Sequence, residues 1–400
     1  MTESTHVPRE NPLIAEMPGQ ASRGHAADLK ELCALAVEGL PPMFIASEQL
    51  FCYRRKLVDD RLVCEGISER YTIIALLGLA AWERSGARSP IDAARVMPRL
   101  LEDLNWPKGI GDLGLLLWLC AEVSPKAVDR LLGEIDLESA LARFRDGREG
   151  RTTEVAWFLT GLSQAMLAMR QSPVKLRNAA RQAYELLRRN QGPAGIFRHM
   201  RTPRTLAAML RSHIGCFADQ VYPIVALTAY AEVSGQTEAL HQAKACAEAI
   251  CRAQGPLGQW WWHYNSSTGA AIGRYPVYSV HQDGMAPMAL LVLSKAGGGD
   301  YLEAVYKGLD WIYGANELSV NLCDGVRQVI WRSIQPEGRY STYLAGAFSM
   351  IGLAPALKVR QLRINYECRP YHFGWLLYAF SGHEYRGRAA VSRHAVHSTM

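Results

Sequence analysis

One stretch of the sequence gathers aromatic and ionisable side chains within a short distance. Segment 259–283 supplies these candidate site residues: Trp261, Trp262, His263, Tyr264, Arg274, Tyr275, Tyr278, His281, Gln282 and Asp283. Aromatic faces stack on the C–H groups of sugar rings, while hydroxyl, imidazole and amide groups bind sugar hydroxyls. The residue types therefore predict a carbohydrate site. In the alternative interpretation, Trp260 and its neighbours only pack this segment against the core.

Two aspartates in similar sequence surroundings are the first candidates for catalysis. Asp219 and Asp283 each begin a strongly apolar segment. Glycoside hydrolysis uses one carboxyl group as general acid and another as base or nucleophile, roughly 5–10 Å apart. Since neighbouring helices pack about 8–10 Å apart, we expect Asp219 and Asp283 to form a catalytic pair. The alternative is that each aspartate caps the N-terminus of its helix.

A second hypothesis assigns proton transfer to histidine and tyrosine. His263, Tyr264 and His281 could move a proton beside a carboxylate, as a uronate lyase or a sugar epimerase requires. The arginines that could hold the acidic group of such a sugar are Arg198, Arg274, Arg332 and Arg369. The formal net charge of +6 agrees with an anionic substrate.

Further candidates precede other apolar segments. Glu367 and His372 are additional catalytic candidates, although a structural salt bridge between Glu367 and Arg369 is an equally open interpretation. The additional candidates for substrate binding in these places are Arg198, His199, Arg332, Tyr340 and Tyr371.

Two kinds of predicted helix alternate along the chain and must position these residues. Amphipathic segments, which suit outer helices, cover 28–39, 89–103, 124–145, 172–190, 237–254 and 299–314. Segments apolar on all sides, which must be buried, cover 69–82, 111–122, 153–168, 217–233 and 283–296, with weaker ones at 340–352 and 371–381. The pattern predicts an all-α fold, an (α/α)6-type toroid of about six hairpins, with a superhelical solenoid as the competing arrangement. No series of strands is predicted. Loops that enter the inner helices of a ring meet at one mouth.

Two of these hairpins share a motif. Gln191 and Gln254 each begin a Gln-Gly-Pro turn, 63 residues apart, and Asp219 and Asp283 follow 64 residues apart. The second copy, Gln-x-x-x-Gly-x-Trp, resembles the "QW" repeat of terpenoid cyclases and their α/α-toroid relatives, among them six-hairpin glycosidases, N-acylglucosamine 2-epimerases and polysaccharide lyases. The resemblance implies a toroid and a structural role for both glutamines, which tie the end of an outer helix to the next turn.

Composition excludes several other classes of protein. The 400 residues are 49% hydrophobic, which excludes a disordered chain. The longest apolar stretch, 72–82, is about half of a membrane span, and no signal peptide or basic nucleic-acid arm is visible. Nine cysteines without a CxxC pair predict reduced thiols in the cytoplasm. No motif predicts a cofactor or a metal. The only candidates for a zinc site are Cys216, Cys323 and His372, which are scattered in the sequence and would have to meet in the fold.

The sequence therefore predicts one toroid domain over 27–384, a flexible N-terminal tail over 1–26 and a basic C-terminal tail over 385–400. The expected function is that of a glycosidase-like enzyme acting on an oligo- or polysaccharide with acidic sugars. The alternatives are a uronate lyase or sugar epimerase, a terpenoid cyclase-like enzyme, and a non-catalytic toroid that binds glycan or protein. The sequence lacks the DxDD motif that protonates substrates in class II terpenoid cyclases, and Val58-Asp59-Asp60 is only a fragment of it, which argues against cyclase chemistry. The sequence alone does not indicate whether the protein is a monomer or an oligomer.

Overall fold

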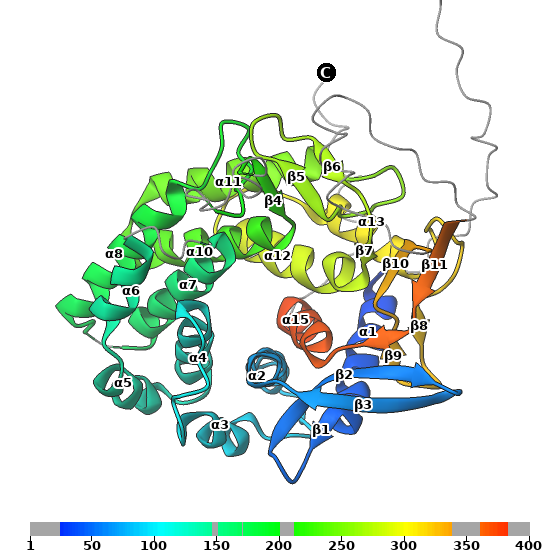
Figure 1. The fold of residues 1–400 in the computed structure, drawn as a ribbon, viewed down its shortest axis with the longest axis horizontal. Coiled ribbons are helices and arrows are strands. Elements are labelled where there is room, and N and C mark those ends of the chain that lie inside the picture. The colour runs from blue at the N-terminus through cyan, green and yellow to red at the C-terminus, as the bar shows by residue number, and fades with distance from the viewer. Residues whose placement is uncertain (1–24, 146–150, 170, 201–211, 338–360, 383–400) are drawn as a thin grey trace, which may run out of the picture.

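Helices arranged in two concentric layers dominate the structure (Figure 1). The computed structural model describes residues 25–145, 151–169, 171–200, 212–337 and 361–382. The inner helices in these ranges are α2 (Glu69–Arg84), α4 (Ile110–Val123), α7 (Thr152–Ala168), α10 (Ala218–Ser234), α12 (Ala286–Lys295) and α15 (Pro370–Phe380). The outer helices are α1 (His25–Gly39), α3 (Ala93–Leu101), α5 (Pro125–Glu134), α6 (Leu137–Arg145), α8 (Val174–Arg188), α11 (Thr237–Arg252) and α13 (Leu302–Ile312).

The ring is closed by its last described helix. Each inner helix packs against the next, and α15 packs against α2 on one side and α12 on the other (Figure 1). Helix α1 covers α15 from outside, so the hairpin that completes the ring joins two distant parts of the chain. The predicted toroid is confirmed and the solenoid alternative is wrong. The expected inner helix at 340–352, the expected C-terminal tail and residues 1–24 of the expected N-terminal tail lie outside the described residues, and α1 begins at His25, inside the predicted tail of 1–26.

The apolar and amphipathic segments take the predicted layers. In α2 an unbroken run from Thr72 to Ala81 is buried, whereas α8 buries one stripe and exposes the other side. The predicted outer helix 124–145 is instead two helices, because the Asp136 carboxylate accepts backbone hydrogen bonds from Glu138 and Ser139 and starts a new helix there. Of the described helices, none is long and apolar enough to cross a membrane.

Two pairs of inner helices touch backbone to backbone through glycine. A Cβ atom at Gly374 of α15 would overlap the backbone carbonyl of Ile74 in α2, and one at Gly78 would overlap the carbonyl of Gly374. Gly161 of α7 meets Gly114 of α4 in the same way. Because larger side chains would separate these helices, the diameter of the inner ring depends on glycine at these contacts.

Short strands form between the helices, in places where the sequence shows no convincing series of alternating residues. The longest are β2 (Leu50–Val58) and β3 (Arg61–Ile67), an antiparallel hairpin that extends to β1 (Phe44–Ile45) and β12 (Glu367–Cys368), near a short 3-10 turn (Pro41–Met43). Asp59 and Asp60 form its two-residue turn with φ of 45° and 63°. Val58-Asp59-Asp60, a fragment of the cyclase motif in sequence, is in the structure the turn of this hairpin.

The remaining strands hold loops at the mouth of the ring. They are β4 (Ile214–Cys216), β5 (His263–Asn265) and β6 (Ala271–Gly273) in one sheet, β7 (Val277–Tyr278), β10 (Ser333–Pro336) and β11 (Leu362–Asn365) in a second, and β8 (Cys323–Asp324) with β9 (Val329–Ile330). They escaped prediction because pieces of two to four residues are too short to show alternation.

The two Gln-Gly-Pro turns make matching contacts. The side-chain amide of Gln191 donates to the carbonyls of Gly195 and Gln242, each at 2.9 Å. That of Gln254 donates to Gly258 at 3.0 Å and to Ala304 at 2.9 Å. In both copies the glutamine therefore joins its own turn to the next outer helix, α11 or α13.

We expect Gly374→Ala to destabilise the protein by about 1–3 kcal/mol, as overpacking of a tight contact does. The matched control is Gly133→Ala in α5, where a Cβ would meet nothing within 4 Å, and which should stabilise by about 0.4–1 kcal/mol. Urea unfolding measures both changes. Equal effects of the two substitutions would contradict the proposed helix contact.

Candidate active site

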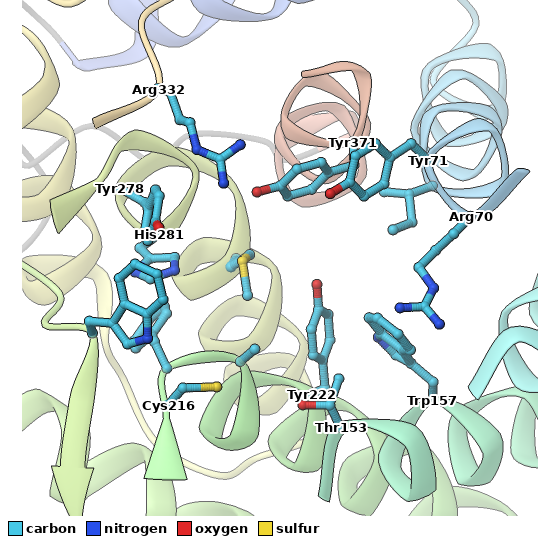
Figure 2. Close-up of a pocket in the computed structure, with 15 residues that line it drawn as sticks. Arg70, Tyr71, Thr153, Trp157, Cys216, Tyr222, Tyr278, His281, Arg332 and Tyr371 are labelled. Atoms are coloured by element: carbon cyan, nitrogen blue, oxygen red, sulfur yellow. The ribbon is translucent and has the colours of Figure 1, made fainter. Parts of the chain in front are cut away.

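A cavity of about 270 Å³ lies inside the ring at the starts of the inner helices. Its walls come from α2, α7, α10, α15 and the loops before them (Figure 2). The lining residues are Arg70, Tyr71, Ile74, Thr153, Trp157, Cys216, Phe217, Ala218, Tyr222, Trp262, Tyr278, His281, Met285, Arg332 and Tyr371. None of these described lining residues is an aspartate or a glutamate. The volume is close to the lower limit of small-molecule sites, about 300 Å³, which suits a ligand of about one ring.

Two guanidinium groups enter the cavity from opposite sides (Figure 2). Arg70 donates to Asp112 at 2.8 Å and to Glu154 at 3.3 Å, so two carboxylates surround one positive charge. Burial raises the pKa of Glu154, and the nearby Arg70 opposes that shift. The positive charge of Arg70 is therefore already balanced by protein groups.

The second guanidinium belongs to an arginine-rich cluster. Arg332 donates to Glu367 at 2.7 Å, and Arg369 and Arg54 bind the same carboxylate. Burial would raise the pKa of Glu367, but Arg332, Arg369 and Arg54 lower it below its ordinary value. Arg54 also pairs with Glu65 at 2.6 Å. Three guanidinium groups facing two carboxylates leave one net positive charge in this cluster, and Arg332 carries it to the cavity wall.

Aromatic faces make up much of the remaining wall. The rings of Tyr71 and Tyr371 lie 4.6 Å apart, and those of Trp262 and Tyr278 also lie 4.6 Å apart. Arg332 lies 5.0 Å from the Tyr278 ring. Burial raises the pKa of Tyr371 and of Tyr278, and Arg332 opposes both shifts. Both phenols are therefore protonated at neutral pH and can donate hydrogen bonds.

Asp219 lies just behind this wall and is fully buried. One carboxylate oxygen accepts from the hydroxyl of Thr153 at 2.9 Å, while the other is 3.0 Å from His199 Nδ1 and accepts from the backbone N–H of Cys216 at 2.9 Å. Burial would raise the pKa of Asp219, but His199 and Cys216 lower it. Asp219 thus contacts cavity residues without lining the cavity itself, and it does not cap α10, whose N-cap residue is Phe217.

Asp283 has different surroundings from those of Asp219. It lies in a π-helical turn, His281–Met285, and His372 Nε2 of α15 contacts both of its oxygens, at 2.6 and 2.8 Å. Burial raises the pKa of Asp283, with His372 opposing the shift. The expected equivalence of the two aspartates is wrong: the matching residues are Gln220, which accepts from the N–H of Phe197, and Gln282, which accepts from that of Trp260.

The structure brings five of the predicted site residues to the cavity, namely Trp262, Tyr278, His281, Arg332 and Tyr371. Trp261, Arg274 and Tyr275 instead line a separate groove of about 670 Å³ beside the Gln254 turn. Tyr264 is buried and accepts from the N–H of Trp261, and half-buried His263 lies on β5 next to Trp262. Arg198 precedes His199 outside the cavity lining, and Tyr340 lies outside the described residues. The salt bridge between Glu367 and Arg369 is present.

The sequence analysis missed Arg70, Tyr71, Thr153, Trp157, Cys216 and Tyr222. Arg70, Tyr71 and Thr153 stand at the starts of inner helices, α2 and α7. The rule that polar residues at the start of an apolar helix meet at the mouth of the ring applies to these three positions as well. Trp157 and Tyr222 lie one turn further along and read as ordinary core residues.

His281 gives the cavity a specific pH dependence. Burial lowers its pKa to about 3, although a hydrogen bond with the backbone of Trp260 opposes the shift. In the unfolded chain its pKa is about 6.5, so the unfolded chain binds a proton that the folded protein excludes. The contribution of neutral, buried His281 to the free energy of unfolding is therefore complete above pH 6.5 and is lost as the pH falls toward 3.

We expect the free energy of unfolding of the wild type, relative to that of His281→Gln, to fall by about 1.4 kcal/mol per pH unit below pH 6.5. Urea unfolding at pH 7, 6 and 5 measures this difference. His241→Gln, on a histidine whose side chain is 73% exposed, should leave the slope unchanged. A slope for His281→Gln that matches the wild-type slope would show that this imidazole is not buried in its neutral form.

Comparison with known proteins identifies the fold. No protein-family model matches the sequence, and neither does any curated protein. Among solved structures, a possible member of the GH105 family from Salmonella enterica aligns with a TM-score of 0.57 at 10% identity, covering 94% of this chain and 98% of that chain. Unsaturated glucuronyl hydrolase from Bacillus sp. GL1 aligns with a TM-score of 0.56 at 13% identity, covering 88% and 94%. A possible GH105 member from Klebsiella pneumoniae gives 0.55 at 14% identity, covering 94% and 98%. The chain is therefore similar to these proteins in its α/α-toroid fold.

Proposed function

We propose that the protein is a glycosidase-like, carbohydrate-active enzyme that acts on a sugar bearing a carboxylate group. The observation that carries this proposal is Arg332, which lines the cavity and belongs to a cluster with one positive charge in excess. A substrate carboxylate bound there would balance that charge and form charge-assisted hydrogen bonds with the guanidinium. Arg70 would serve as a hydrogen-bond donor, since its charge is already balanced.

The size and walls of the cavity support a single sugar ring. About 270 Å³ leaves no room for several rings in a row. Trp262 and Tyr278 offer flat faces for the ring, and Tyr71, Tyr222 and Tyr371 bring hydroxyl groups near its polar edge (Figure 2). An oligosaccharide would therefore place its terminal residue in the cavity. Two of the structures of similar fold are unsaturated glucuronyl hydrolases, one of them specific for heparin, which agrees with an acidic terminal sugar.

Asp219 is the carboxylate that we assign to the reaction centre. It binds Thr153 and Cys216, both of which line the cavity, whereas both oxygens of Asp283 contact His372. Hydrolysis by two carboxylates requires both of them at the wall, and Asp283 does not line the cavity. We therefore propose a catalytic role for Asp219 and a structural one for Asp283, His372 and Glu367.

A second candidate function is proton transfer at the carbon next to the substrate carboxylate, as in a lyase or an epimerase. It is favoured by the tyrosines and His281 at the wall, beside Arg332. Cleavage of a glycosidic bond with uptake of water distinguishes hydrolysis from both, because a lyase forms a double bond and an epimerase leaves the glycosidic bond intact.

We also propose that the protein is located in the cytoplasm, since all nine cysteines are free.

Arg332→Gln should weaken binding of glucuronate or an unsaturated uronyl disaccharide about 10- to 100-fold, the range for a hydrogen bond to a charged group. Binding of glucose should not change. Arg274→Gln, in the separate groove, is the matched control. Isothermal titration or ligand-dependent thermal stabilisation measures the affinities. Uronate binding that Arg332→Gln leaves intact would refute the proposed anion site.

Asp219→Asn should lower turnover of an unsaturated uronyl disaccharide at least about 100-fold, because it removes the negative charge of the carboxylate assigned to the reaction centre, while sugar affinity stays within a few-fold of the wild-type value. Asp283→Asn should mainly lower the free energy of unfolding, by about 1–3 kcal/mol, because it replaces one of the two fully buried carboxylate oxygens that His372 Nε2 contacts. Initial rates, together with urea unfolding of both variants, separate the two effects. Full turnover in Asp219→Asn would remove this residue from the reaction centre.

A further inference from the structure

Beside the cavity, three side chains that offer a nitrogen, a sulfur and an oxygen atom to a metal lie close together, all within residues 199–219. The ligand atoms of His199, Cys216 and Asp219 all lie within 4.8 Å of one another. From this cluster we infer that the protein binds a zinc ion through the imidazole, the thiolate and the carboxylate. Nitrogen, sulfur and oxygen ligands of these kinds are those that zinc takes in proteins.

The spacing of the cluster is close to that of a zinc site. Tetrahedral zinc with bonds of about 2.0–2.3 Å places its ligand atoms roughly 3.3–3.7 Å apart. In the structure, His199 Nδ1 and an oxygen of Asp219 are 3.0 Å apart, and the thiol of Cys216 completes a triangle within 4.8 Å. The upper limit of 4.8 Å is thus about 1 Å above the separation that tetrahedral zinc requires.

Each of the three residues stands on a fixed backbone. His199 donates its backbone N–H to Ile214 at 2.8 Å and accepts from the N–H of Thr152 at 2.9 Å. Cys216 ends β4, which pairs with β5, and Asp219 lies in the first turn of α10. A site held by a strand and two helix starts keeps its ligands in place before the metal arrives, which favours binding.

The carboxylate also has an outer shell of partners. Thr153 donates its hydroxyl to one oxygen of Asp219, at 2.9 Å, and the backbone of Cys216 donates to the other, at 2.9 Å. Hydrogen bonds of this kind orient metal ligands and are a regular part of zinc sites. One oxygen of Asp219 can therefore turn to the metal while the other stays bound to Thr153.

Three protein ligands leave the fourth position of zinc open, which is the pattern of catalytic rather than structural zinc sites. Because Cys216 lines the cavity, a zinc ion bound to its thiolate would lie beside the cavity. There it would activate a water molecule or polarise a sugar oxygen. This catalytic role rests on the proposed function, whereas binding of zinc does not. Binding as thiolate releases the proton of the Cys216 thiol to solvent.

The test uses the full-length protein, stripped of metal with a chelator and titrated with cobalt(II), then with zinc(II). Wild-type protein should bind one equivalent of cobalt with a thiolate-to-cobalt absorption band, which zinc abolishes by displacement. Cys216→Ser should lose the band, and His199→Gln and Asp219→Asn should bind zinc at least tenfold more weakly. Cys251→Ser, on a half-buried thiol of α11, is the matched control and should retain the band.

Zinc should also raise the melting temperature of the wild type and leave that of Cys216→Ser unchanged. Absence of the thiolate band in the wild type, or its persistence in Cys216→Ser, would overturn the inference. The outcomes separate this inference from the proposed function. If metal-free protein turns over uronates and gains no thiolate band when cobalt is added, the zinc site alone is refuted. If the protein binds zinc at this site but has no affinity for uronates, the proposed function alone is refuted.

Discussion

The closed ring depends on how near its inner helices can come to one another. At Gly78 with Gly374, and at Gly114 with Gly161, backbones touch where any side chain would hold them apart. Because a ring must return to its starting point, excess separation at one contact cannot be relieved locally and would spread to the other contacts. The narrow lumen, and with it a cavity that suits a single ring, follows from these contacts, since wider helix spacing would enlarge the space between the helix starts.

The same closure explains the chemistry of the cavity wall. Its side chains come mostly from the first turns of α2, α7, α10 and α15 and from the loops before α10 and α12. Acidic groups occur one layer further out, where Asp112, Glu154 and Glu367 neutralise or orient arginines. A wall of cationic and phenolic groups with carboxylates behind it attracts anions, and the cluster to which Arg332 belongs has one positive charge more than its carboxylates balance.

How far the sequence predicts this structure differs between fold and site. Helical periodicity suffices for the layers, because a run such as Thr72–Ala81 can only be buried. The site needs distances between segments, which no local pattern contains. Asp219 and Asp283 resemble each other in sequence, but the π turn at His281–Met285 shifts the register, so that Gln220 and Gln282 correspond. The spacing of His199, Cys216 and Asp219 in the sequence matches no zinc motif. Their ligand atoms come together only because the His199 backbone bonds to β4, which leads directly into α10.

The position of α15 has a consequence for how the protein is made. Arg369 binds the hydroxyl of Tyr71, 298 residues earlier in the chain, and α15 packs against both α1 and α2. During synthesis the earlier helices can assemble only into an open arc, whose two end helices expose apolar sides until the last segment leaves the ribosome. Contacts over such sequence separations form slowly. The ring and the wall of the cavity therefore stay incomplete until α15 docks against α1, α2 and α12, so that one late helix completes both in the same step.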